Sequence, residues 1–254
     1  MNKESYFWLE ERDIPSGNGF ILWGNAHKVA IIVIVLIIVA SIIVFERARR
    51  YREMMLRSIA VLLPILEILK ISVLTVHDRM DLGHLPIHLC SIAIYIYPLI
   101  VFTGSEKVRQ IFSEISVITL LPAAVCAIAF PDWTMYPIIN FYSLHSFIWH
   151  MLQIIFPILC LKIGWCKPSI KNIWKNLVFL IICAGMVLIF DHTCNCNYWF
   201  LMRPVSGTPL QNIYDIFGKR LYLPVLALIV TTVNVLMYGV VKVFYRNVSR
   251  EEGE

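Results

Sequence analysis

The run VAIIVIVLIIVASIIVF at residues 29–45, which ends at Glu46 and Arg47, decides the fold class of this chain. About 20 consecutive apolar residues are enough to cross the hydrocarbon core of a bilayer as a helix. Inside lipid the backbone has to satisfy its own polar groups, which favours helices. Six more segments of similar character follow, at about residues 57–76, 86–102, 112–130, 144–161, 174–190 and 221–241. The sequence therefore predicts an all-α, polytopic membrane protein with seven transmembrane helices.

The composition excludes an ordinary soluble domain, because 59% of the 254 residues are hydrophobic and only 15% are charged. The short connections between the segments leave no room for a second domain. We expect an interfacial, extracytoplasmic segment at residues 1–28, a seven-helix domain at 29–241 and a cytoplasmic tail at 242–254.

Basic residues gather in one set of alternate loops. The loops after the first, third and fifth segments, together with the C-terminal tail, carry about twice as many Lys and Arg residues as the other loops. By the positive-inside rule these loops face the cytoplasm, so the N-terminus should lie outside. The net charge of +5 then reflects topology and contacts with anionic lipids. We expect a multi-pass protein of the cell membrane with no nucleic-acid partner.

Charged side chains inside a membrane segment are expensive and are candidates for function. Glu67 and Lys70 lie three residues apart in the second segment, on one face of the helix. The pair is interpreted either as a buried ion pair that fixes helix packing or as a support for a chemical site.

The histidines are distributed unevenly. Six of the seven are predicted in or near the outer halves of the segments, and His27 lies just before the first segment. Convergent histidines indicate acid–base chemistry or a metal site. The candidates for catalysis are His88, His150 and His192.

The third and fifth segments carry further candidates. Pro86 suits the first turn of a helix, which would place His88, Ser91 and Tyr95 on one face that points into the bundle. Cys90 lies on a different face and is the candidate nucleophile. In the fifth segment, Gln153 shares a face with the candidate base at position 150.

The outer loop at about residues 191–220 is long, and long ordered loops often carry function. Its candidate binding residues are Asn195, Asn197 and Arg203. The neighbouring Asp191 and His192 have the side chains of metal ligands, but their spacing matches no standard zinc pattern.

These segments resemble the YwaF-like bacterial integral membrane proteins and, more distantly, the eukaryotic transmembrane protein 164 acyltransferases. The resemblance covers most of the chain. It rests on Pro86-x-His88, Trp149-His150-Met151-Leu152-x-x-x-Pro157, Phe190-Asp191-His192, Asn195-x-Asn197 and Arg203-Pro204. It implies transfer of a fatty acyl group between phospholipids through an acyl-cysteine, without coenzyme A, and its relatives include hydrolases of fatty-acid esters.

One position departs from the resembled eukaryotic pattern, which reads Pro-Cys-His at the third segment. Here Ile87 stands where that cysteine is the nucleophile. Cys90 follows one helical turn later, roughly 4–5 Å along a helix axis, and could replace it with a different acyl-chain pose. Otherwise His88 or another group acts, or the acyl-transfer chemistry is absent.

Three hypotheses follow. In the first, the protein is a lipid acyltransferase or esterase that takes phospholipids or lysophospholipids, with the acyl chain entering laterally between helices and the ester at the outer headgroup level. It needs no cofactor and no metal: Cys90 is the nucleophile, and His88 or His150 is the base. The second is a seven-helix transporter or small-ligand receptor, and the third is a zinc-dependent membrane hydrolase that uses Asp191 and the histidines at positions 88, 150 and 192.

Overall fold

The computed structural model describes residues 6–251, with side chains described as far as Phe244. Regular structure in this range is helical throughout, which confirms the all-α prediction. The main helices are α1 (Asn25–Arg47), α2 (Arg52–Val76), α3 (Ala93–Phe102), α4 (Glu106–Ile115), α5 (Leu121–Ala129), α6 (Phe141–Lys162), α7 (Ile173–Cys194) and α8 (Pro209–Glu251). A π-helical turn at Ser116–Leu120 joins α4 to α5, and α8 is kinked at Gly218, whose φ is 70°.

Six of the seven predicted segments become helices that are long and apolar enough to cross a membrane. The segment predicted at 86–102 does not, because its helical part is confined to Cys90–Phe102. At 1.5 Å per residue this part is roughly 20 Å long, short of a hydrocarbon core of about 30 Å. The predicted helix start at Pro86 is therefore wrong.

Side chains from elsewhere hold the stretch before α3 out of the helix. The carbonyl of Ile87 accepts a hydrogen bond from Trp199 Nε1 at 2.8 Å, and the carbonyl of Pro86 accepts one from the Tyr95 hydroxyl at 3.2 Å. Tyr95 is 56% exposed, so its predicted inward orientation is also wrong, whereas Ser91 is buried as predicted.

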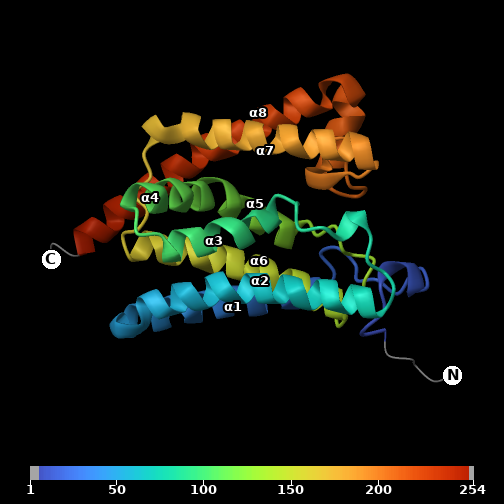
Figure 1. The fold of residues 1–254 in the computed structure, drawn as a ribbon, viewed down its shortest axis with the longest axis horizontal. Helices are drawn as coiled ribbons and strands as arrows, with labels where there is room; N and C mark the ends of the chain where they lie inside the picture. The colour runs from blue at the N-terminus through green and yellow to red at the C-terminus, as the bar shows by residue number, and fades with distance from the viewer. Residues whose placement is uncertain (1–5, 252–254) are drawn as a thin grey trace.

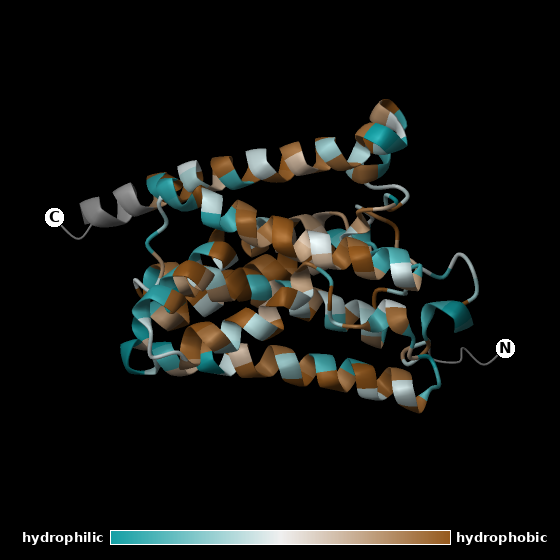
Figure 2. Cartoon of the chain, turned by 45° about the horizontal axis from the view of Figure 1, so that its top comes forward, coloured by the Kyte–Doolittle hydropathy of each residue, from teal (hydrophilic) through white to brown (hydrophobic). Residues whose placement is uncertain are grey.

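The helices form three layers (Figure 1). The hairpin of α1 and α2 lies along one edge, α7 and α8 lie along the opposite edge, and α6 lies between them with α3, α4 and α5. Buried residues make up 78% of the apolar window of α6 but only 11% of that of α1 and 17% of that of α7. The edge helices therefore present their apolar side chains to lipid. In Figure 2 hydrophobic residues predominate in the middle turns of the helices, and hydrophilic residues gather near the two ends of the bundle.

The N-terminal segment packs across one end of the bundle. Asn140 Nδ2 donates to the carbonyls of Tyr6 and Leu9 at 2.6 and 3.0 Å, and the amide of Phe141 donates to the carbonyl of Phe7 at 2.8 Å. At the other terminus α8 continues to Glu251, so the predicted tail at 242–254 is helical as far as the described residues extend.

Candidate functional site

The end of the bundle that carries the N-terminal segment also carries the histidines. We call it the histidine end; it comprises loops 77–92, 130–140 and 195–208 with the adjoining turns of the helices. Two of its histidines lie outside the candidate site: one is packed in the core and the other is exposed on the surface. His27 is fully buried, its Nδ1 accepts from the Trp23 amide at 3.1 Å, and its Nε2 therefore donates to the carbonyl of Ile128 at 2.9 Å. His192 is exposed.

A buried ion pair lies near the last turns of α2. Lys70 Nζ is 2.8 Å from Glu67 Oε1, and the glutamate side chain is only 5% exposed. The predicted pairing is confirmed. His145 of α6 lies beside this pair, because its Nε2 bonds the carbonyl of Leu66 at 3.2 Å and its ring interacts electrostatically with the lysine.

His88 and His150 converge on the same region from different elements. Lys70 and His150 both lie within electrostatic range of the His88 imidazole. The His150 ring stacks on Trp133 at a centroid distance of 5.1 Å, and its Nδ1 bonds the carbonyl of Ser146 at 2.7 Å. One nitrogen of this buried imidazole is thus held by α6 itself, while Nε2 has no hydrogen-bond partner among the described residues.

Cys90 lies at the start of the helical turn that leads into α3. Its thiol interacts with the side chain of Ser91. Lys70 and Glu67 lie within electrostatic range of the thiol. Its carbonyl accepts a hydrogen bond from Gln153 Nε2, and the fully buried Oε1 of that glutamine has no hydrogen-bond partner among the described residues. Four candidate residues therefore lie around Cys90 in one polar region: Glu67, Lys70, Ser91 and Gln153.

Asp132 was not predicted by the sequence reasoning. It lies in the loop between α5 and α6, and its carboxyl lies within electrostatic range of the Cys90 thiol. Burial raises the pKa of this carboxyl. A signal for it existed: a single acid between Pro131 and Trp133 in a short aromatic loop.

The loop after α7 is a scaffold for the segment before α3. Asn197 Oδ1 accepts from the amides of Met202 and Arg203 at 3.2 and 3.0 Å, and its Nδ2 donates to the carbonyl of Arg203 at 3.0 Å. The next residue, Tyr198, places its ring 4.5 Å from the ring of His88. Both ends of the Asn197 amide are thus bonded to the loop backbone, so binding a substrate, as predicted, would require some of these hydrogen bonds to break.

The structure does not bring every candidate into the polar region. His192, Asn195 and Arg203 are exposed. Asn195 ends α7 in the left-handed conformation with a φ of 54°, a common helix C-cap for asparagine. These three residues lie where solvent or lipid headgroups can reach them.

An apolar groove of about 470 Å³ lies between α3 and α7. Its α7 side is formed by Phe179, Cys183, Met186, Val187 and Phe190. Leu85 and Ile87 line it at the histidine end, directly before His88. The groove thus connects the lipid-facing side of α7 with the segment that carries the candidate catalytic residues.

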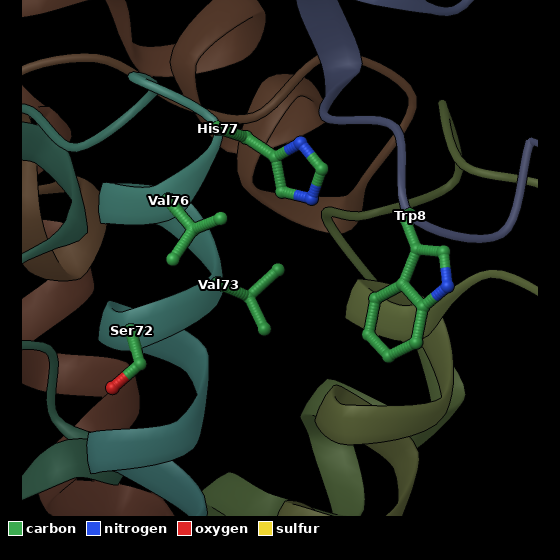
Figure 3. Close-up of a pocket in the computed structure, with 5 residues that line it drawn as sticks. All are labelled: Trp8, Ser72, Val73, Val76 and His77. Atoms are coloured by element: carbon green, nitrogen blue, oxygen red, sulfur yellow. The ribbon is translucent and has the colours of Figure 1, made fainter.

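A second pocket of about 320 Å³ lies between the N-terminal segment and α2 (Figure 3). Trp8 faces Val73 and His77 across it, and its lining carries one hydroxyl, that of Ser72. That hydroxyl donates to the carbonyl of Ile68 at 2.8 Å, so the pocket offers little polar chemistry.

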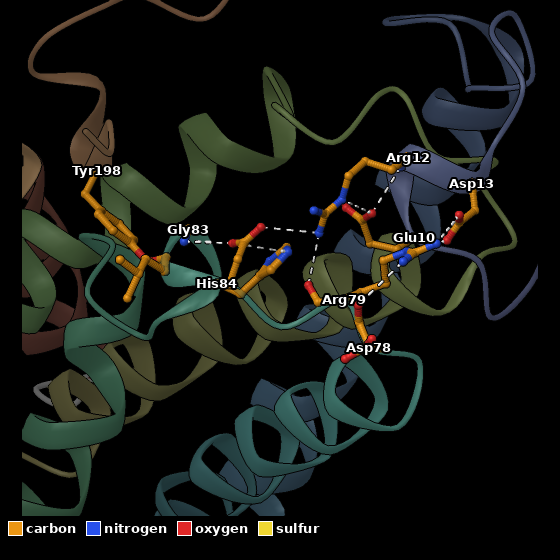
Figure 4. Close-up of polar contacts among 10 residues, drawn as sticks. Glu10, Arg12, Asp13, Asp78, Arg79, Gly83, His84 and Tyr198 are labelled. Atoms are coloured by element: carbon orange, nitrogen blue, oxygen red, sulfur yellow. Dashed lines mark hydrogen bonds and ion pairs between the residues drawn. The ribbon is translucent and has the colours of Figure 1, made fainter. Parts of the chain in front are cut away.

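Charged residues fasten the N-terminal segment over the histidine end (Figure 4). Arg79 donates to both oxygens of Asp13, at 2.5 and 2.8 Å. Arg12 lies 3.3 Å from Asp81, which is itself 3.8 Å from His84. Burial lowers the pKa of His84 more than Asp81 raises it. This chain of contacts links the N-terminal segment to the loop that leads to His88.

The zinc hypothesis needs a group of metal ligands. Among the residues that the structure describes, no three His, Cys, Asp or Glu side chains are placed to hold one ion. Asp191 is fully buried, but its Oδ1 accepts from the amide of Tyr198 at 3.0 Å, and the neighbouring His192 is exposed.

The comparisons with known proteins match one family. Residues 22–238 match the TMEM164 family, a range that includes every candidate site residue. No curated protein and no solved structure matches the chain. The match agrees with the resemblance to transmembrane protein 164, while the likeness to YwaF-like proteins stays a prediction. This multi-pass membrane chain belongs to the TMEM164 family.

Proposed function

We propose that this protein acts on lipid acyl groups, by transfer between phospholipids without coenzyme A or by hydrolysis of their esters. One observation carries the proposal: the apolar groove reaches Ile87, and the half-buried polar region begins at the next residue, His88. An acyl chain in the groove would bring its ester bond to the candidate catalytic groups. Membrane-derived acyl chains can enter sideways, because α7 is mostly exposed to lipid.

The groups present can carry out a two-step transfer. The Cys90 thiol gives its proton to an imidazole, that of His88 or His150, and the sulfur attacks the ester carbonyl carbon. The carbon–oxygen bond to glycerol breaks, and the leaving oxygen takes the proton from the imidazolium. The thioester then passes its acyl group to a lysophospholipid hydroxyl, or to water in a hydrolase, and the thiol is restored.

Other candidates support this reaction. Lys70, paired with Glu67, brings a positive charge near the Cys90 thiol and the His88 imidazole, which favours a developing oxyanion. Arg203 is exposed and is proposed to contact the lipid phosphate at the membrane surface.

The test uses purified protein in detergent with mixed phospholipids and a lysophospholipid acceptor. Lipid turnover is followed by mass spectrometry of the lipids, and the protein mass is measured intact. We expect one acyl adduct that hydroxylamine removes, lost in Cys90→Ser and retained in Cys194→Ser. His150→Ala should abolish turnover while His77→Ala does not. Full activity in both His150→Ala and His88→Ala would contradict the proposal.

A transporter or receptor is the second candidate, favoured by the buried Glu67–Lys70 pair beside His145. Intramembrane ion pairs of this kind often mark proton or ion pathways. It would be supported by the absence of both adduct and turnover, together with proton or solute movement in proteoliposomes that is lost in Glu67→Gln.

A further inference from the structure

The groove has a regular wall on α7. Phe179, Cys183, Met186 and Phe190 follow one another at intervals of four, three and four residues, and all four line it. This spacing places them on one face of the helix. The groove therefore runs along the helix axis.

The two ends of the groove differ. At the histidine end it reaches Ile87, whose carbonyl is bonded by Trp199. At the other end the ring of Phe179 meets the ring of Phe112 from α4 edge to face, with centroids 6.4 Å apart. An aromatic pair thus lies at this end of the groove, where α7 approaches α4.

The dimensions and chemistry of the groove fit one occupant. From Phe190 to Phe179 the helix rises roughly 16 Å, about half of a hydrocarbon core of about 30 Å, which is one leaflet. The polar groups of Tyr95 and Trp199 in its wall are already bonded to backbone carbonyls. What remains is apolar apart from the Cys183 thiol, and the exposed side chain of Met186 in its wall leaves it open to lipid.

We propose that the groove holds a single acyl chain of a membrane lipid, and that Phe179 is its floor and limits the chain length that the protein accepts. The proposal rests on the proposed function for the identity of the reacting ester. It adds a substrate class: lipids whose acyl chain spans one leaflet, with the ester at Ile87 and the chain end against the Phe112–Phe179 pair.

The test offers the purified protein an equimolar series of phospholipids that differ only in acyl-chain length. Phe179→Ala should shift the transferred or released acyl groups toward longer chains, by about fourfold for each methylene that becomes buried. Cys183→Phe, one turn nearer the histidine end, should shift them toward shorter chains. Ile182→Ala is the matched control, since this side chain is 56% exposed on the same helix and does not line the groove.

A second readout does not depend on turnover. The chain lengths of phospholipids retained by each variant after detergent exchange are measured by native mass spectrometry. Turnover with an unchanged length profile in both Phe179→Ala and Cys183→Phe overturns the floor and leaves the proposed function standing. A shifted profile of retained lipids without turnover supports the floor and overturns the proposed function. If Phe179→Ala fails to fold, Cys183→Phe alone decides between these outcomes.

Discussion

Single side chains determine whether the segment before α3 can do chemistry. Ile87 lines the groove, and it stands where the resembled eukaryotic pattern has its cysteine. Its carbonyl is held by Trp199 and the adjacent His88 ring by Tyr198. Position 87 is therefore a fixed point on the groove wall at which a nucleophile would face a bound acyl chain.

We predict that Ile87→Cys creates a second site of acylation. A thiol at this position would meet the ester from the groove side, so the adduct should form even when Cys90 is replaced by serine. Intact-protein mass and peptide mapping of Ile87→Cys/Cys90→Ser would locate it. The native Cys183, which also lines the groove but lies about two turns along α7 from Phe190 and the histidine end, is the control; acylation of both thiols to the same extent would contradict the prediction.

Pairs of elements are joined by polar contacts at the two ends of the bundle. At the end opposite the histidines, Glu114 of α4 is only 2% exposed and accepts four hydrogen bonds. The donors are Gln110, Ser169, Asn172 and Tyr238. Through them α4 holds the start of α7 and the middle of α8, which keeps the groove wall in place.

We predict that Glu114→Gln destabilises the protein although it preserves size. The amide NH₂ would face donors, so at least one hydrogen bond to a charged acceptor would be lost, at about 1.5–3 kcal/mol. Thermal unfolding in detergent measures the change. Glu106→Gln, an exposed acid on the same helix, should shift the unfolding midpoint much less, and equal shifts would count against the network.

The N-terminal segment is joined to the end of α2 in a pH-dependent way. Arg79 lowers the pKa of Asp13, and Arg12 and His77 act in the same direction. A carboxyl whose pKa is lowered on folding stabilises the fold above its unfolded pKa of about 3.9. That contribution is lost as the pH falls through the lower pKa of the folded state.

We therefore predict that Asp13→Asn lowers the unfolding midpoint at pH 7, and that the difference from the wild type shrinks as the pH falls below about 3.9 and through the lower pKa of folded Asp13. The measurement is thermal unfolding in detergent across this range. The double variant Asp13→Asn/Arg79→Gln separates the pair from other effects. A difference that persists unchanged at low pH would show that the ion pair is not its source.

At the scale of the molecule, the two ends of the bundle differ in chemistry. One end carries the histidines, and the other carries most of the exposed basic residues, including Arg49, Arg50 and Lys107. If the basic end faces the cytoplasm, the proposed lipid site works in the outer leaflet.

We predict that a fluorescent protein fused to the C-terminus is fluorescent in cells and that an alkaline phosphatase fused there is inactive. An active phosphatase fusion would reverse the orientation.

Long apolar runs alone were enough for the class of fold and for most of the helices. Because hydrocarbon cannot satisfy backbone polar groups, each long apolar run has to be a helix wherever it lies in the bundle. The same constraint makes a charged residue inside a run conspicuous, so the Glu67–Lys70 pair could be read from its spacing. The gathering of histidines at one end followed from their places along these runs.

Tertiary structure decided the beginning of α3, because Trp199 and Tyr95 bond carbonyls that a helix starting at Pro86 would have used. It also decided the composition of the candidate site, bringing Asp132 within electrostatic range of Cys90 and leaving His192 exposed. The groove belongs to this level as well, since no local pattern shows which face of α7 lies against α3. The length of an apolar run determines one helix at a time, whereas these features arise from contacts between different elements.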